Sequence, residues 1–225
     1  PGDDGFVGDP LHVYFVKEGG TGIGTQSDPS NVAAVLAQPD FKDGSVMVLL
    51  DANGNITAPI TLNHSNQQII GGGNTGTANV DFADIMFAPP GQYVLHLSGL
   101  GGRPTLMPTS GNAITLDDRN IIQGFTIDGS GGITNGISGH PGSTLTVVND
   151  MIIKNVSGTG IVINPSISTT ISNTTFTNNG TDIQLDASNT KLTNITSTGA
   201  VNGSISIGVG GDIFASTNIT DVTIT

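Results

Sequence analysis

The sequence contains no cysteine and no tryptophan, and it is poor in residues that favour helices. The absence of cysteine excludes disulfide bonds and thiolate metal sites. Glutamate occurs once, lysine four times and arginine twice. Because these residues are common helix formers, we do not expect long helices. Aromatic residues make up only 4% of the chain, so the aliphatic residues must provide the core.

Positive charge is also scarce. Six lysine and arginine residues stand against 18 aspartate and glutamate residues, which gives a formal net charge of −12 at pH 7. A chain of this charge without a basic patch is repelled by phosphate backbones, so we expect no nucleic-acid partner. An anionic lipid surface is disfavoured for the same reason. No apolar run is long enough for a transmembrane helix, and we expect no direct membrane insertion of this segment.

The abundant residues favour strands and tight turns. Glycine alone accounts for 33 residues, and asparagine and threonine are frequent. Threonine and isoleucine favour strands, whereas glycine and asparagine tolerate the backbone of sharp turns. The composition therefore predicts an all-β protein with many short strands.

The start of the chain has a distinct organisation. Residues 1–10 are rich in glycine, proline and aspartate and predict a linker. Residues 11–44 predict an N-terminal cap, with a strand at 11–16 and a helix at 31–38 that ends before Pro39. In that helix three aliphatic residues share one face at helical spacing, and we expect them to pack on the end of the domain: Val32, Val35 and Leu36.

Residues 45–225 become repetitive, beginning with a buried strand at 45–50. One register places an isoleucine in successive short strands, at intervals of 23, 24, 22 and 22 residues: Ile114, Ile137, Ile161, Ile183 and Ile205. In a second register an aliphatic residue is followed two positions later by a turn former: Ile122 and Gly124, Val147 and Asn149, Ile171 and Asn173, Leu192 and Asn194, Ile219 and Asp221.

Two registers with one period predict two strand positions in every repeat. The fold that explains both is a right-handed parallel β-helix with about 22–25 residues per rung, in which the aliphatic residues stack into ladders. Residues 45–110 are less regular, but the segments at 56–63, 66–73 and 92–101 have the same character. The chain stops on a fresh strand without a cap, so we expect truncation at the C-terminus and further domains of the same chain beyond Thr225.

The segment VYFVKEGGTGIGTQSDPSNVAAVLAQPDFKDGSVMVLL at 13–50 resembles the start of pectate-lyase-like β-helices. The segments GFTIDG at 124–129 and ISNTTFTNNGTDIQL at 171–185 resemble repeats of that superfamily. The superfamily includes lyases, glycosidases, phage tailspikes and adhesins, so the resemblance implies the fold and not one function.

A second resemblance concerns the segment from DANGNI at 51–56 through ITLNHSNQQIIGGG at 60–73. It is similar to β-helical segments beside inverse-autotransporter β-domains, the relatives of intimin and invasin. This resemblance implies a secreted module on the bacterial outer surface, of adhesin or autotransporter-passenger type, with a part in virulence. The expected partner is a host or cell-surface protein or glycan, bound through the long exposed faces and the insertion loops, especially those at 71–92 and 208–216.

Three residues are candidates for catalysis in an alternative interpretation. Polygalacturonase-type glycosidases of the superfamily use an aspartate pair and a histidine about one rung later, which matches Asp117, Asp118 and His140. Paired carboxylates suit glycoside hydrolysis, because one protonates the leaving oxygen and the other activates water. Two parts of the family pattern are missing: an earlier aspartate, where this chain has residues 95–97, and an Arg-x-Lys pair after His140. We therefore expect corner aspartates, a surface histidine and no catalytic residue.

A lyase would need a basic residue and Ca²⁺ held by aspartates. Arg119 and Lys154 are 35 residues apart, about one and a half rungs, so we do not expect them to stack. Oxygen-rich corners suit Ca²⁺, but no loop has a recognisable ligand spacing, and we expect no metal or other cofactor. The alternatives to an adhesin module are a polysaccharide-active glycosidase or lyase and a tailspike-like carbohydrate binder, which would be an obligate trimer.

Overall fold

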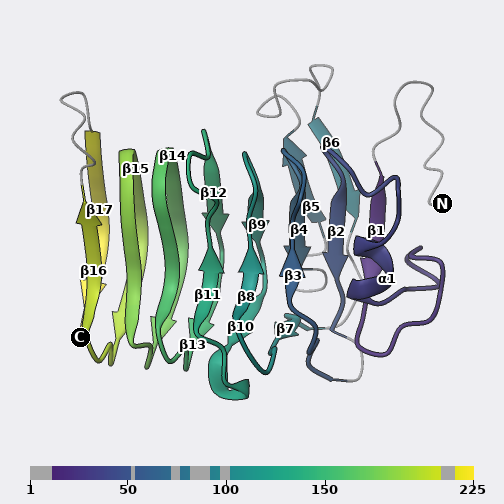
Figure 1. The fold of residues 1–225 in the computed structure, drawn as a ribbon, viewed down its shortest axis with the longest axis horizontal. Helices are drawn as coiled ribbons and strands as arrows, with labels where there is room; N and C mark the ends of the chain where they lie inside the picture. The colour runs from purple at the N-terminus through teal and green to yellow at the C-terminus, as the bar shows by residue number, and fades with distance from the viewer. Residues whose placement is uncertain (1–11, 52–53, 72–76, 82–91, 97–101, 209–215) are drawn as a thin grey trace.

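The computed structural model describes residues 12–51, 54–71, 77–81, 92–96, 102–208 and 216–225. It is all-β, with parallel strands stacked as a β-solenoid of about 6 turns. The strands follow one another along the long axis from the purple N-terminal end to the yellow C-terminal end (Figure 1). The expected linker at 1–10 and the greater part of the expected binding loops at 71–92 and 208–216 lie outside the described residues.

Three stacks of parallel strands form the sides of the coil. The first stack holds β1 (Val13–Val16), β2 (Val46–Leu49), β4 (Gln68–Gly71), β9 (Ile121–Gln123) and β12 (Thr146–Asn149). The second holds β3 (Ile60–Thr61), β8 (Asn112–Thr115), β11 (Asn135–Ser138) and, at its C-terminal end, β16 (Gly203–Gly208). The third holds β7 (Thr105–Leu106), β10 (Thr126–Asp128) and β13 (Ile152–Lys154).

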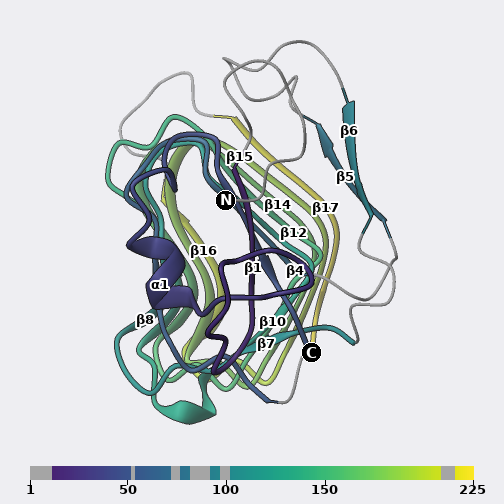
Figure 2. The ribbon, with the colours of Figure 1, turned by 90° about the vertical axis from the view of Figure 1, so that its right-hand side faces the viewer.

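Two long strands continue around the coil and join the stacks. They are β14 (Thr159–Thr177) and β15 (Thr181–Thr198), and β17 (Ser216–Ile224) pairs with β15 in the last turn. Seen along the axis, the strands of successive turns superimpose (Figure 2). The core therefore lies inside the coil, where aliphatic side chains of each turn contact those of the next.

The predicted isoleucine ladder is confirmed. Ile114, Ile137, Ile161 and Ile183 are direct partners in neighbouring strands and are fully buried. Ile205 completes the ladder at the C-terminal end and is partly buried. The ladder also extends one step toward the N-terminus, because Ile60 pairs with Ile114.

The second predicted register is wrong by one residue in one rung. Val148, and not Val147, is the partner of Ile122 and Ile171, and only Val148 is fully buried. Because side chains alternate between the two faces of a strand, a shift of one residue exchanges inside for outside. The corner of this rung is accordingly Asp150 and not Asn149. It has a positive φ like the other corners of the register: Gly124, Asn173, Asn194 and Asp221.

The described part of the segment at 92–101 is not a rung, which corrects the prediction made from its strand-like character. Its described part is β6 (Gln92–His96), which pairs antiparallel with β5 (Thr77–Asp81) in a separate two-stranded sheet beside the coil (Figure 2). The chain re-enters the coil before β7. There Arg103 donates hydrogen bonds to the carbonyl oxygen of Asp150 at 2.7 Å and to its carboxylate at 2.6 Å. Arg103 thus binds the segment that leads into β7 to the corner residue Asp150.

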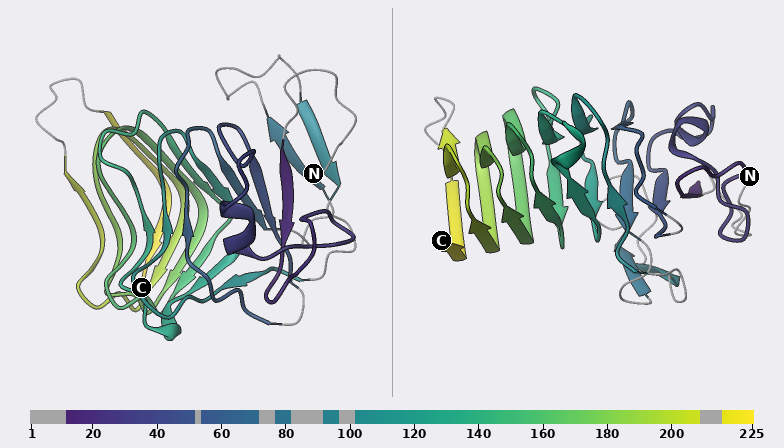
Figure 3. Two further views of the ribbon diagram at one scale, coloured as in Figure 1. Left: turned by 45° about the vertical axis from the view of Figure 1, so that its right-hand side comes forward. Right: turned by 90° about the horizontal axis from the view of Figure 1, so that it is seen from below.

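The N-terminal cap has the predicted helix in a shorter form, α1 (Val32–Leu36). Asn31 is its N-cap, since its side chain accepts a hydrogen bond from the amide of Ala34 at 2.9 Å. Val32 and Val35 are buried against the core and Leu36 packs on it partly buried, at the N-terminal end of the coil (Figure 3). Within the part of the chain that is described, no helix has the length and apolar character needed to cross a membrane.

Candidate functional site

Asp118 lies in the turn after β8 and is tied to the next rung. Its Oδ1 accepts hydrogen bonds from the amide of Thr144 at 2.6 Å and from the Thr144 hydroxyl at 2.8 Å. Arg119, which has a φ of 55°, donates through Nε to the same hydroxyl at 2.9 Å and lies 3.6 Å from Asp118 Oδ2. The carboxylate therefore holds two turns of the coil together.

Asp117 and His140 lie in the same region but take no part in that contact. The amide of Asp117 donates to Asn120 Oδ1 at 2.6 Å, and its side chain is half-buried. The side chain of His140 is exposed, and its carbonyl accepts a hydrogen bond from the amide of Ser143. Among the described residues, no hydrogen bond or ion pair joins His140 to either aspartate.

The length of one loop explains this separation. In register, the eight residues 139–146, which end with the first residue of β12, correspond to the five residues 116–120 between β8 and β9. The partner of Asp118 is consequently Thr144, 26 residues later, and not His140, 22 residues later. The three candidates therefore lie on adjacent turns of the coil, but their side chains do not form one catalytic group.

Two basic residues of the rungs, Lys154 and Arg119, lie close to carboxylates. Lys154 Nζ lies 3.1 Å from Asp128 Oδ2 on β10, whereas Arg119 lies in the turn before β9. Burial raises the pKa of Asp128, but hydrogen bonds from Asn155, Ser130 and Lys154 outweigh it and lower the pKa to about 2. Asp128 is thus a structural anion, and Lys154 and Arg119 lie on different sides of the coil.

One carboxylate lies inside the coil, and the sequence patterns did not single it out. Asp182 on β15 is fully buried and accepts hydrogen bonds from the Ser197 hydroxyl and from Asn179 Nδ2. Asn179 is also fully buried, and its Oδ1 accepts from the amide of Val156 at 2.9 Å. This polar cluster is closed to solvent and satisfies its own hydrogen bonds, so its contribution is to packing.

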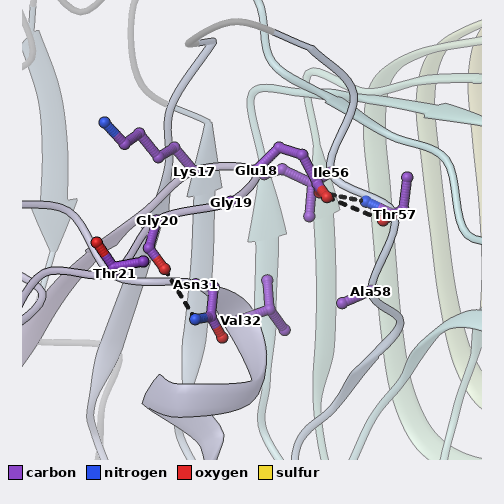
Figure 4. Close-up of a pocket in the computed structure, with 10 residues that line it drawn as sticks. All are labelled: Lys17, Glu18, Gly19, Gly20, Thr21, Asn31, Val32, Ile56, Thr57 and Ala58. Carbon is purple, nitrogen blue, oxygen red and sulfur yellow. Dashed lines mark hydrogen bonds between the residues drawn. The ribbon is translucent and has the colours of Figure 1, made fainter.

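A hollow of about 350 Å³ lies beside the N-terminal cap (Figure 4). Its polar groups are largely paired with one another. Glu18 accepts hydrogen bonds from the amide of Thr57 at 2.8 Å and from its hydroxyl at 3.1 Å, and Asn31 donates to the carbonyl of Gly20 at 2.8 Å. Lys17 points away from Glu18 in the close-up. The hollow offers space but no nucleophile and base held together.

No group of three or more histidine, aspartate or glutamate side chains suited to a metal ion occurs among the described residues. What the rungs do provide is a long lateral surface of hydroxyls and amides. At one corner Asn173 donates to Asn149 Oδ1 and Asn194 donates to Asn173 Oδ1, both at 2.9 Å. Such a surface presents many similar hydrogen-bonding groups in rows, which suits binding better than a reaction at one atom.

No protein-family model matches the chain, and neither a curated protein nor a solved structure is detectably similar to it. The structure therefore supports a parallel β-solenoid at the level of fold. The finer likeness to pectate-lyase-like and inverse-autotransporter segments depends on the quoted sequence segments alone.

Proposed function

We propose that this chain is a rigid structural and binding module of a bacterial cell-surface protein, of the adhesin or autotransporter-passenger type. The observation that carries the proposal is the continuous stack of parallel rungs with polar lateral faces. A solenoid of this kind extends in one dimension, and every added rung lengthens the surface without altering its shape. That property suits a protein that must present a binding surface away from a cell.

The roles of the ionisable groups support binding over catalysis. Catalysis needs convergent groups with tuned pKa values in a cleft. Here the carboxylate of Asp118 accepts two hydrogen bonds from Thr144, and Asp128 is paired with Lys154. His140, which the glycosidase interpretation needs, lies exposed in a turn. The carboxylates of Asp118 and Asp128 stabilise the coil, and a binding role does not require any of these groups to act in a reaction.

The proposal places the module outside the bacterial cell, with a host or cell-surface protein or glycan as its partner. The acidic composition fits this setting, since a net charge of −12 keeps an extended chain soluble and disfavours phosphate-rich partners. The lateral faces of the later rungs offer hydroxyl and amide groups to such a partner. We expect weak contacts repeated along the surface.

The test combines a binding assay with an activity assay. Labelled protein is titrated onto host cells and immobilised matrix glycans, and a panel of neutral and acidic polysaccharides is assayed for reducing ends and unsaturated products, with and without Ca²⁺. We expect saturable binding and no turnover above buffer. Asp118→Asn is the matched variant, because asparagine keeps an acceptor for Thr144 and removes only the charge.

Turnover by the wild-type protein that disappears in Asp118→Asn would overturn the proposal in favour of a glycosidase. Turnover that needs Ca²⁺ and survives in Asp118→Asn would indicate a lyase that uses other residues. An obligate trimer in light scattering, together with polysaccharide binding, would indicate a tailspike-like protein. Absence of saturable binding to every surface would contradict the binding role itself.

A further inference from the structure

The last three turns of the coil share a six-residue pattern that the earlier turns lack. Each has a serine or threonine, then an asparagine or aspartate, and then a threonine at the fourth and sixth positions: SNTTFT at 172–177, TNITST at 193–198 and TDVTIT at 220–225. The corresponding residues of the preceding turn are NDMIIK at 149–154. Within this sequence the pattern is therefore confined to the turns from residue 172 onward.

Strand register aligns these threonines in two rows. Thr175, Thr196 and Thr223 are direct partners in β14, β15 and β17. Thr177 is the partner of Thr198, whose hydroxyl shares a hydrogen bond with that of Thr225 at 3.1 Å. Of the residues between the rows, Phe176 and Ser197 are fully buried, whereas Ile224 in the last turn is exposed. The six aligned residues, here called the threonine array, are Thr175, Thr177, Thr196, Thr198, Thr223 and Thr225.

The array has the geometry of a flat lattice. Neighbouring strands lie about 4.8 Å apart, and alternate residues along a strand lie about 6.6 Å apart. Sheets stay flat when stacking and side-chain ladders oppose their twist, and the Asn149–Asn173–Asn194 ladder runs beside the array. β14, β15 and β17 lie side by side with little twist (Figures 1 and 3). Threonine is also stiff about χ1, so its hydroxyl and methyl groups are held in place.

The side chains of the array are all of one kind and uncharged. In a protein of net charge −12, neither row contains an ionised side chain. On the turn before the array, the rows continue with Ile152 and with Lys154, which is paired with Asp128. Small ligands and flexible chains favour concave sites with convergent groups, whereas this face repeats one group in two directions. The partner that matches is itself flat, neutral and periodic in two dimensions.

We propose that the threonine array binds the surface of ice. The hydroxyls hold water molecules by hydrogen bonds in the space between the two threonine rows. The methyl groups offer these water molecules no hydrogen bond, so their remaining hydrogen bonds go to water of the ice crystal. Hexagonal ice has oxygen rows with repeats similar to those of the array in both directions. This binding differs from the adhesive role proposed above in its partner, which is ice and not a macromolecule, although both roles use the later turns.

Ice recrystallisation tests the proposal directly. The full 225-residue chain is flash-frozen as a thin film, and the growth of ice grains is followed just below the melting point against an equal mass of an inert protein. We expect the wild-type chain to slow grain growth. Thr196→Lys, in the centre of one row, should abolish this effect, and Thr223→Lys should weaken it, because a long charged side chain prevents close contact between the two flat surfaces.

Thr193→Lys is the matched control. Thr193 is half-buried like Thr196 and receives the same change of charge, but it lies across the asparagine corner on another face, in register with Ser172 and Thr220. Its activity should equal that of the wild type, and circular dichroism verifies that all variants are folded. The proposal is contradicted if ice grains grow as fast with the wild-type chain as with the inert protein, or if Thr193→Lys loses as much activity as Thr196→Lys. If the wild-type chain has no effect on ice growth but binds a neutral polysaccharide, and Thr196→Lys abolishes that binding, the partner of the array is a glycan and not ice.

Discussion

Aspartate 118 shows how a single side chain joins two turns of the coil. It accepts two hydrogen bonds from Thr144, one from an amide and one from a hydroxyl. Hydrogen bonds to a charged group contribute more to stability than neutral ones, and removal of the acceptor leaves both donors unpaired. We expect Asp118→Ala to lower the free energy of unfolding by about 1–3 kcal/mol, measured by urea denaturation. Asp117→Ala should change it much less, and equal losses would contradict the assigned role.

Aspartate 128 predicts a pH dependence of stability. Its folded pKa of about 2 lies below the ordinary value of 3.8, so its contribution is complete above pH 4 and is lost as the pH falls toward 2. That contribution is about 2 kcal/mol. Urea denaturation at pH 5 and pH 2 should show a larger loss in the wild type than in Asp128→Asn. The difference isolates Asp128, because Asp40, whose pKa is lowered by a hydrogen bond from Tyr14, remains in both proteins.

The corners determine how each strand passes into the next. Asn194 has a φ of 53° and donates a hydrogen bond to Asn173. A β-branched residue cannot adopt this backbone without strain, whereas glycine can. Asn194→Val should therefore destabilise the protein by about 1–2 kcal/mol, and Asn194→Gly should cost clearly less, since it loses only the ladder bond. Thermal unfolding of the two variants compares their stabilities. Equal losses of stability would show that the lost asparagine hydrogen bond, and not backbone strain, causes the destabilisation.

At the scale of the whole molecule, the ladder of isoleucines ought to make the coil strongest in its middle. Ile137 is fully buried between Ile114 and Ile161, whereas Ile205 is partly buried and, among the described residues, has a ladder neighbour on one side only. Ile137→Ala should lower the free energy of unfolding by about 2–5 kcal/mol. Ile205→Ala should lower it by less. A loss at Ile205 as large as that at Ile137 would mean that the C-terminal turn is packed more tightly than its exposure indicates.

The sequence by itself determined the period, the ladder and the cap. Those features are local or strictly repeated: Ile114 to Ile205 recur at nearly constant intervals, and Val32 and Val35 have helical spacing. Stacked rungs must place equivalent residues above one another, so a regular period in the sequence becomes a register in space. The candidate site was predictable only as a set of residues. Residue type and spacing identified the candidates Asp117, Asp118 and His140. The type of a residue does not reveal which groups its side chain contacts.

The tertiary structure alone decided the features that depend on loop length and on pairing between distant segments. Three extra residues before β12 placed Thr144, and not His140, beside Asp118. The pairing of Val148 with Ile122 and Ile171 put the corner at Asp150 and not at Asn149. The strand-like segment at 92–96 lies outside the coil and pairs antiparallel with β5. The threonine array likewise exists only because the turns ending at 177, 198 and 225 align despite unequal lengths. Strand pairing tolerates loops of different lengths, so register is settled by contacts across the coil and not by distance along the chain.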